Sequence, residues 1–139
     1  MNNKIQITID AHVNAPIEKV WDYYTKPEHI TKWNFASDDW ECPSTSNDLI
    51  AGGKYIARMQ AKDGSFGFDF EAIYDDIINN EKIAYTMTDG RHAIVSFHNL
   101  GDKTEVTVTF DAETENPIEM QRDGWQSILN NFKKYAENK

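Results

Sequence analysis

An amphipathic segment near the C-terminus places the strongest constraint on the fold. From residue 118 onward, apolar side chains recur at three- and four-residue spacing: Ile118, Trp125, Ile128, Leu129, Phe132 and Tyr135. This spacing predicts a helix with one broad apolar face. Such a helix is roughly 30 Å long at 1.5 Å per residue, and its apolar face needs an apolar surface of similar length. We therefore expect the preceding chain to form a sheet that the helix covers.

The start of this helix carries its own signals. Asn116, Pro117 and Glu119 stand where an N-cap residue, a first-turn proline and an N3 glutamate would lie. This arrangement is close to a capping box and predicts a helix that begins at Pro117. Gly124 is unusual in a helix interior, where glycine costs about 1 kcal/mol against alanine. We expect it to allow close approach to the sheet or to leave room for a ligand.

The segments before the helix have the alternating pattern of strands. Residues 5–13 alternate apolar and polar side chains with period two. Further strands are predicted at 54–62, 66–78, 82–88, 91–99 and 103–112, with turn pairs such as Asp63-Gly64 and Asp89-Gly90 between them. A long loop is predicted over 34–53, because this segment contains Pro43, two serines and the Gly52-Gly53 pair.

Two prolines mark short helices in the first part of the chain. Pro16 precedes an apolar stripe that includes Val20 and Trp21, and Pro27 precedes Ile30 and Trp33. The predicted fold class is therefore α+β, with a curved antiparallel sheet of about six strands, two short N-terminal helices and a long C-terminal helix. We expect one domain over 1–139, because 139 residues is a common domain size.

Composition excludes several function classes. The formal net charge is −9 and no long basic run is present, which argues against nucleic acids and anionic membranes as partners. No apolar stretch is long enough to span a membrane. The single cysteine, Cys42, cannot form an internal disulfide and fits a reducing compartment. We therefore expect a cytoplasmic protein, either a monomer or a homodimer.

Several short motifs, taken in order, resemble a known family. They are APIEKVW at 15–21, KPEHI at 26–30 with Trp33, GGKY at 52–55, EKIAYT at 81–86, TEVTV at 104–108 and GWQSIL at 124–129. Together they span nearly the whole chain. The ordered set resembles the SRPBCC (START-like, birch-allergen-like) superfamily, and within it the subfamily named for activators of the heat-shock protein 90 ATPase.

This resemblance implies a helix-grip fold with a hydrophobic cavity between the sheet and the C-terminal helix. Relatives in the wider superfamily carry lipids, bind hormones, or act as polyketide aromatases and cyclases. The eukaryotic co-chaperones of the subfamily carry an additional N-terminal domain that contributes to chaperone stimulation. We expect the subfamily name to describe ancestry here.

Aromatic and apolar side chains are the candidate ligand-binding residues. Three lie at or in the predicted loop, where a pocket mouth could form: Trp33, Phe35 and Trp40. The others could line an interior cavity: Tyr55, Phe68, Phe70, Tyr85, Met87, His92, Phe97, Met120 and Trp125. Each aromatic side chain could instead serve only as core packing.

Titratable residues give no catalytic or metal-binding pattern. The four histidines have neither an i, i+4 pair on a helix nor a partnering cysteine, so no metal site is expected. Asp69 and Glu71 share one face of a strand about 6.6 Å apart, but the opposite face is aromatic, so both acids are expected to face water. Cys42 has no basic neighbour to activate it. No cofactor and no catalytic residue is predicted.

The sequence therefore favours non-catalytic binding of a small hydrophobic or aromatic ligand between the sheet and the C-terminal helix. Two alternatives remain at this stage. One is a cyclase- or aromatase-type enzyme, which needs a titratable side chain buried in the cavity. The other is a chaperone-linked protein-interaction module, which needs an exposed apolar patch.

Overall fold

The computed structural model describes residues 5–138. Seven strands form one antiparallel sheet in the spatial order β1-β7-β6-β5-β4-β3-β2. The strands are β1 (Gln6–Val13), β2 (Trp40–Asn47), β3 (Lys54–Ala61), β4 (Gly67–Ile78), β5 (Lys82–Met87), β6 (His92–Asn99) and β7 (Thr104–Asp111). Strands β2 to β7 form a meander in which consecutive strands pair. Strand β1 extends the sheet by pairing with β7, so β1 and β2 are its two edges.

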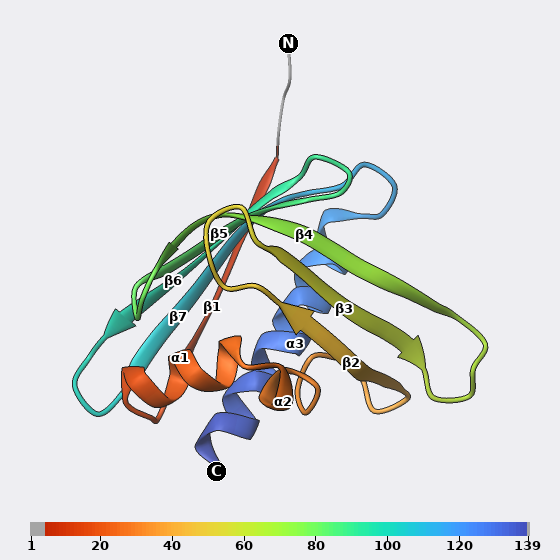
Figure 1. The fold of residues 1–139 in the computed structure, drawn as a ribbon. Coiled ribbons are helices and arrows are strands. Elements are labelled where there is room, and N and C mark those ends of the chain that lie inside the picture. The colour runs from red at the N-terminus through yellow and green to blue at the C-terminus, as the bar shows by residue number, and fades with distance from the viewer. Residues whose placement is uncertain (1–4, 139) are drawn as a thin grey trace.

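Three helices accompany the sheet: α1 (Ile17–Thr25), α2 (Pro27–Ile30) and α3 (Ile118–Glu137). The sheet is strongly curved, and α3 runs along its hollow between the two outer strands, while α1 and α2 lie across one end (Figure 1). This arrangement covers the apolar face of α3, as the amphipathic pattern requires. No helix of the described residues is both long and apolar enough to cross a membrane.

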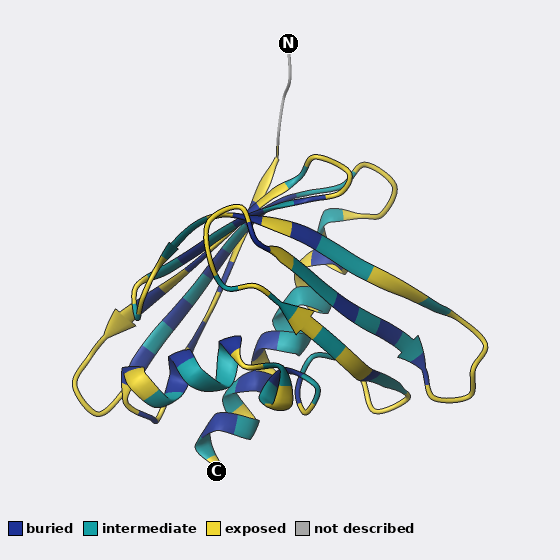
Figure 2. Cartoon of the chain, viewed as in Figure 1, coloured by how far each residue is buried: buried dark blue, intermediate teal, exposed yellow. Residues whose placement is uncertain are grey.

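Alternation along the strands builds the core. Buried and exposed residues alternate along β1 and β6 (Figure 2), and β7 places Val106, Val108 and Phe110 on the buried side. Phe132 of α3 is fully buried against this layer. Because the side-chain period of a strand is two, one face of the sheet collects the apolar residues and faces the helix.

Side chains of α3 also fasten it to the free edge of β1. Gln126 Nε2 donates to the Asp10 carbonyl at 3.1 Å, and Lys133 Nζ donates to the His12 carbonyl at 2.7 Å. The backbone N–H of Asn14 donates to Glu137 Oε2 at 2.8 Å. An edge strand leaves such backbone groups unpaired, and these contacts satisfy them.

The predicted strands, both short helices and the long helix are confirmed to within a few residues. The turn pairs are confirmed too, because Gly64, Asn80, Gly90 and Gly101 all have positive φ. The predicted loop at 34–53 is wrong in its middle, where β2 pairs with β3.

The composition of β2 explains the error. Pro43 and two serines disfavour a strand, but β2 is an edge strand and has only one neighbour. A register shift between Glu41 and Ser44 accommodates Pro43, whose missing N–H costs nothing at that point. Pairing with β3 therefore overrides the local preference.

The predicted capping box is also wrong. The helix begins at Ile118, and Pro117 occupies the N-cap position without a side-chain cap. The buried side chain of Gln121 instead fixes the segment before the helix: its Oε1 accepts from the Glu113 N–H at 2.9 Å, and its Nε2 donates to the carbonyls of Glu113 and Asn116 at 3.1 and 2.8 Å. Asn116 lies before the N-cap position, and its backbone N–H and Nδ2 donate to the Glu113 carboxylate at 2.6 and 3.1 Å.

Candidate functional site

A pocket of about 290 Å³ lies between the curved sheet, the α1–α2 region and α3. The sheet contributes Tyr55, Met59, Phe68, Phe70, Tyr74, Ile83 and Tyr85, together with Arg91 from the β5–β6 turn. The α1–α2 region contributes Tyr24, Thr25, Ile30, Trp33 and Asn34, and α3 contributes Trp125 and Ile128. The walls are therefore mainly aromatic and aliphatic, with a few polar groups among them.

The strand period places the sheet residues in this pocket. Phe68, Phe70 and Tyr74 occupy alternate positions of β4 and so share the face that looks toward α3. Neighbouring strands extend the aromatic wall: the Tyr55 ring lies 5.9 Å from Phe70 and the Tyr85 ring 6.1 Å from Phe70, both edge-on. Edge-on packing is a preferred geometry for aromatic pairs and adds to their apolar burial.

Half of the candidate ligand-binding residues line this pocket: Trp33, Tyr55, Phe68, Phe70, Tyr85 and Trp125. The remaining candidates lie elsewhere. Phe97 packs edge-on against Trp21 with ring centroids 5.1 Å apart, and Met87 is buried in the core. Phe35 is half-buried, and its carbonyl accepts a hydrogen bond from Asn131.

Three further candidates are on the surface or near it. His92 is exposed because it alternates with the buried Ala93, and its Nδ1 lies 2.9 Å from the Thr86 hydroxyl on the outer face. Met120 is 61% exposed, on the solvent side of α3. Trp40 is half-buried beside Phe66 and Phe68, at the edge of the pocket wall.

Sequence reasoning missed several lining residues. Tyr74 follows Phe68 and Phe70 at the same strand period, so alternation alone was a sufficient signal for it. Tyr24 and Ile128 lie on apolar helix stripes, which do not say whether a residue faces the core or a pocket. Arg91 follows a turn and carried no local signal.

Three tyrosine hydroxyls in the pocket have no hydrogen-bond partner among residues 5–138: those of Tyr24, Tyr55 and Tyr85. A fourth, that of Tyr74, accepts a hydrogen bond from Asn47 Nδ2 at 3.1 Å. Burial is the main cause that raises the pKa of all four phenols above the ordinary value, and for Tyr24, Tyr55 and Tyr85 the neighbouring tyrosines raise it further. The phenols are therefore neutral at physiological pH and can donate a hydrogen bond to a guest.

Arg91 is the one charged residue among the described residues that line the pocket. Its Nε donates to Asp89 Oδ2 at 2.7 Å, and its backbone N–H donates to Asp89 Oδ1 at 3.1 Å. Partial burial alone raises the pKa of the Asp89 carboxyl, but the hydrogen bonds from Arg91 outweigh it and lower that pKa. Asp89 thus stays ionised and holds the guanidinium in a defined orientation.

The titratable residues considered from the sequence lie outside the lining. Asp69 is exposed and pairs with Arg58 at 3.4 Å, and Glu71 pairs with Lys54 at 3.2 Å, so the expected water-facing placement of the two acids is confirmed. Cys42 is buried, and that burial raises the pKa of its thiol, which makes it a poor nucleophile.

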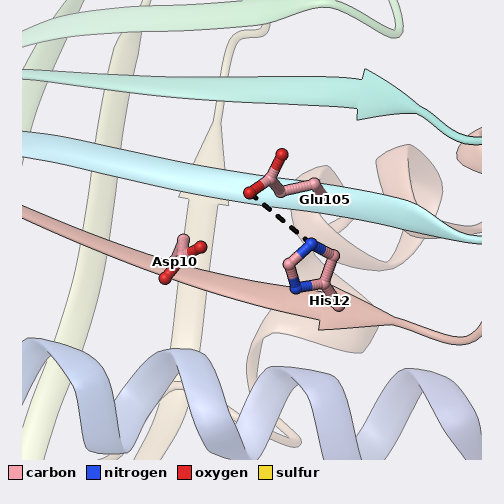
Figure 3. A group of neighbouring side chains, drawn as sticks. All are labelled: Asp10, His12 and Glu105. Atoms are coloured by element: carbon pink, nitrogen blue, oxygen red, sulfur yellow. Dashed lines mark ion pairs between the residues drawn. The ribbon is translucent and has the colours of Figure 1, made fainter.

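One group of potential metal ligands gathers on the outer face of the sheet (Figure 3). Asp10 and His12 of β1 lie near Glu105 of β7, with His12 Nε2 3.6 Å from Glu105 Oε2 and all ligand atoms within 4.8 Å of one another. Asp10 and His12 are exposed, and ion pairs at such positions contribute little. The alternation of β1 directs both side chains away from the pocket, so this group is no part of the candidate site.

Comparisons with known proteins agree on the fold. The family model described as activator of Hsp90 ATPase homolog 1-like protein matches residues 14–137. The solution structure of an AHSA1-like protein from Aeromonas hydrophila is 41% identical, with a TM-score of 0.91 over 96% of this chain and 93% of that one. A solution structure from Cytophaga hutchinsonii is 49% identical, with a TM-score of 0.83 over 96% of this chain and 92% of that one.

More distant structures share only the fold. A crystal structure from Nitrosomonas europaea has a TM-score of 0.83 at 15% identity, over 99% of this chain and 97% of that one. No curated protein matches the sequence.

Proposed function

We propose that this chain, which belongs to the family of activator of Hsp90 ATPase homolog 1-like proteins, binds a small hydrophobic or aromatic molecule in the pocket beneath α3 without transforming it. The fold of this family suits a domain that binds a ligand or a partner, and the pocket favours the first. The observation that carries the proposal is an aromatic-walled pocket with three unpartnered phenols among its described residues.

The size and chemistry of the pocket support this proposal. Ligand pockets are mostly apolar, measure roughly 300–1,000 Å³ and carry a few convergent polar groups. At about 290 Å³ this pocket is at the small end of that range, which suits a compact guest. Aromatic walls would supply affinity, and the free phenols would orient a ligand oxygen.

The lining favours binding over the cyclase or aromatase alternative. No Asp, Glu or His is among the described lining residues, so the usual acid–base groups are missing from the pocket wall. The tyrosines that are present have a raised pKa, which makes them weak acids near neutral pH. Hydrogen-bond donation suits them better than proton transfer.

A matched pair of variants on α3 tests the binding proposal. Ile128 lines the pocket, whereas Ile118 is also partly buried on the same helix but does not. Neutral aromatic and aliphatic compounds are screened against ¹⁵N-labelled protein by chemical-shift changes. We expect Ile128→Trp to abolish binding of the hits and Ile118→Trp to preserve it. Hits that bind both variants equally, or a screen without hits, would count against the pocket.

A protein-interaction function has one observation in its favour. The half-buried Trp40 and the exposed Phe66 and Phe68 form an aromatic cluster at the surface, with Phe66 62% and Phe68 44% exposed and ring centroids about 6 Å apart. Exposed apolar patches mark interaction sites, and the family description names the Hsp90 ATPase. The test is the ATPase rate of a purified bacterial Hsp90 with and without the protein. Stimulation that Phe66→Ser removes would support this function, and an unchanged rate would argue against it.

A further inference from the structure

We propose that the preferred ligand is a small amphipathic carboxylic acid, whose carboxylate is held by Arg91 and Tyr85 while its apolar body lies among the aromatic walls. This inference rests on the proposed binding function and adds the chemical class of the ligand.

The guanidinium of Arg91 is oriented but not saturated. Asp89 engages its Nε and its backbone N–H, and the structure gives no partner among residues 5–138 to either terminal nitrogen. The Arg91 side chain is 25% exposed, whereas that of Asp89 is 51% exposed. Water therefore screens the charge of Asp89 more than that of Arg91. The Arg91 guanidinium, which lines the pocket, thus gives the pocket a positive electrostatic potential on its side.

Tyr85 supplies a second donor to the lining of the same pocket. It lies on the pocket face of β5, is 8% exposed, and its hydroxyl has no partner among the described residues. Arg91 is near enough for its charge to oppose the rise in the pKa of Tyr85, although burial dominates and the phenol stays protonated. Because this hydroxyl belongs to a lining residue and has no partner among residues 5–138, it is available to donate to a ligand oxygen.

A carboxylate matches this pair of donors better than other groups. The terminal N–H groups of a guanidinium form a planar fork that fits two carboxylate oxygens, and a phenol O–H reaches a remaining lone pair. A dianionic phosphate would meet only one positive side chain in the described lining of a protein with net charge −9. A single negative charge on an apolar body is the better complement, with Phe70 and Trp125 among the walls that would contact the body.

Acids and their neutral amides of the same shape separate this inference from the binding proposal. The probes are 4-phenylbutyrate and 4-phenylbutyramide, and octanoate and octanamide, titrated by calorimetry at pH 7.5. We expect each acid to bind at least tenfold more tightly than its amide. Arg91→Gln should reduce acid affinity about tenfold and leave the amides unchanged, Arg91→Lys should restore part of the preference, and Tyr85→Phe should weaken the acids severalfold.

Arg58→Gln is the control, because Arg58 also pairs with an aspartate but lies outside the lining, and it should keep the preference. Equal binding of acids and amides, or a preference that survives Arg91→Gln in a protein that still unfolds cooperatively, overturns the carboxylate inference. If no probe binds while neutral hits of the screen still do, carboxylate recognition is wrong and the binding function stands. If no compound shows binding that depends on Ile128, both proposals fail.

Discussion

The indole of Trp125 stacks on the ring of Phe110, with centroids 3.9 Å apart and only 10° between the ring planes. Phe110 is fully buried in β7, whereas Trp125 belongs to α3 and also lines the pocket. One ring pair therefore fastens the helix to the sheet and forms part of the pocket wall. Stability and pocket shape are coupled at this point.

Trp125→Ala tests that coupling. We expect the free energy of unfolding to fall by about 2–3 kcal/mol, somewhat less than for a fully buried tryptophan, because Trp125 is only partly buried. Trp125→Phe keeps a ring against Phe110 and should cost less than half as much. Urea unfolding of both variants gives the comparison, and equal losses would mean that stacking on Phe110 contributes little.

Gly124→Ala should stabilise the protein. A Cβ built at Gly124 meets nothing within 4 Å, so the expected close approach to the sheet does not explain this glycine. Alanine favours a helix interior by about 0.5–1 kcal/mol, and unfolding should require that much more free energy. Gly101→Ala is the matched control, because its Cβ also meets open space but its φ is +94°. There the substitution should destabilise, and a gain at Gly101 would contradict the argument from backbone conformation.

Gln121→Ala should lower the free energy of unfolding by about 2 kcal/mol. Its side chain makes three hydrogen bonds to backbone groups before α3, and their loss leaves partly buried groups without partners. Gln126→Ala on the same helix removes two exposed bonds, one to the Asp10 carbonyl at the edge of β1 and one to Asn130, and should cost about 0.5 kcal/mol. Thermal unfolding of the two variants checks the order, and a larger loss at Gln126 would contradict the role of Gln121 in fixing the segment before α3.

Alkaline pH should destabilise the fold. The pKa values of Tyr24, Tyr55 and Tyr85 are raised above 10 by burial, so the unfolded chain loses these phenolic protons first. Their contribution is intact below about pH 10 and is lost as pH rises from there toward the folded-state pKa values. Each of these phenols adds at most about 1.4 kcal/mol per pH unit to the decrease in the free energy of unfolding. Urea unfolding between pH 8 and 11.5 measures the free energy of unfolding, which should fall less steeply with pH in Tyr85→Phe than in the unmodified protein.

Tyrosinate absorbance provides an independent check of this prediction. At pH 11 in native protein, fewer tyrosines should be ionised than in urea-unfolded protein at the same pH. Identical absorbance in the two states, with the native protein still folded, would show that burial does not protect these phenols.

Local signals were enough for most of the fold. Alternation in 103–112 and the turn pairs at Asp63-Gly64 and Asp89-Gly90 each act over a few residues, so a single sequence displays them. Strand β2 was beyond such reasoning. Its residues have poor strand propensity, and only the available edge of β3, contributed by 54–61, makes the strand form.

The candidate site was predictable only in part, for a similar reason. An aromatic residue at a buried strand position could be core or pocket wall, and alternation does not separate the two. Two aromatic residues on different strands illustrate this: Phe97 packs against Trp21 in the core, whereas Phe70 lines the pocket. Arg91 and Asp89 meet through turn geometry that no hydrophobic pattern encodes.

The sequence by itself determined that an amphipathic helix must cover an antiparallel sheet, because hydrophobic periodicity is a local property of the chain. Only the tertiary structure decided where a pocket forms between α3 and the sheet. The curvature of the sheet and the seating of α3 through Trp125 on Phe110 depend on contacts between residues far apart in the chain. The local β5–β6 turn places Arg91 near the end of the strand that carries Tyr85, and the long-range contacts add Trp125 of α3 to the same pocket. The proposed binding of a carboxylic acid depends on this combination.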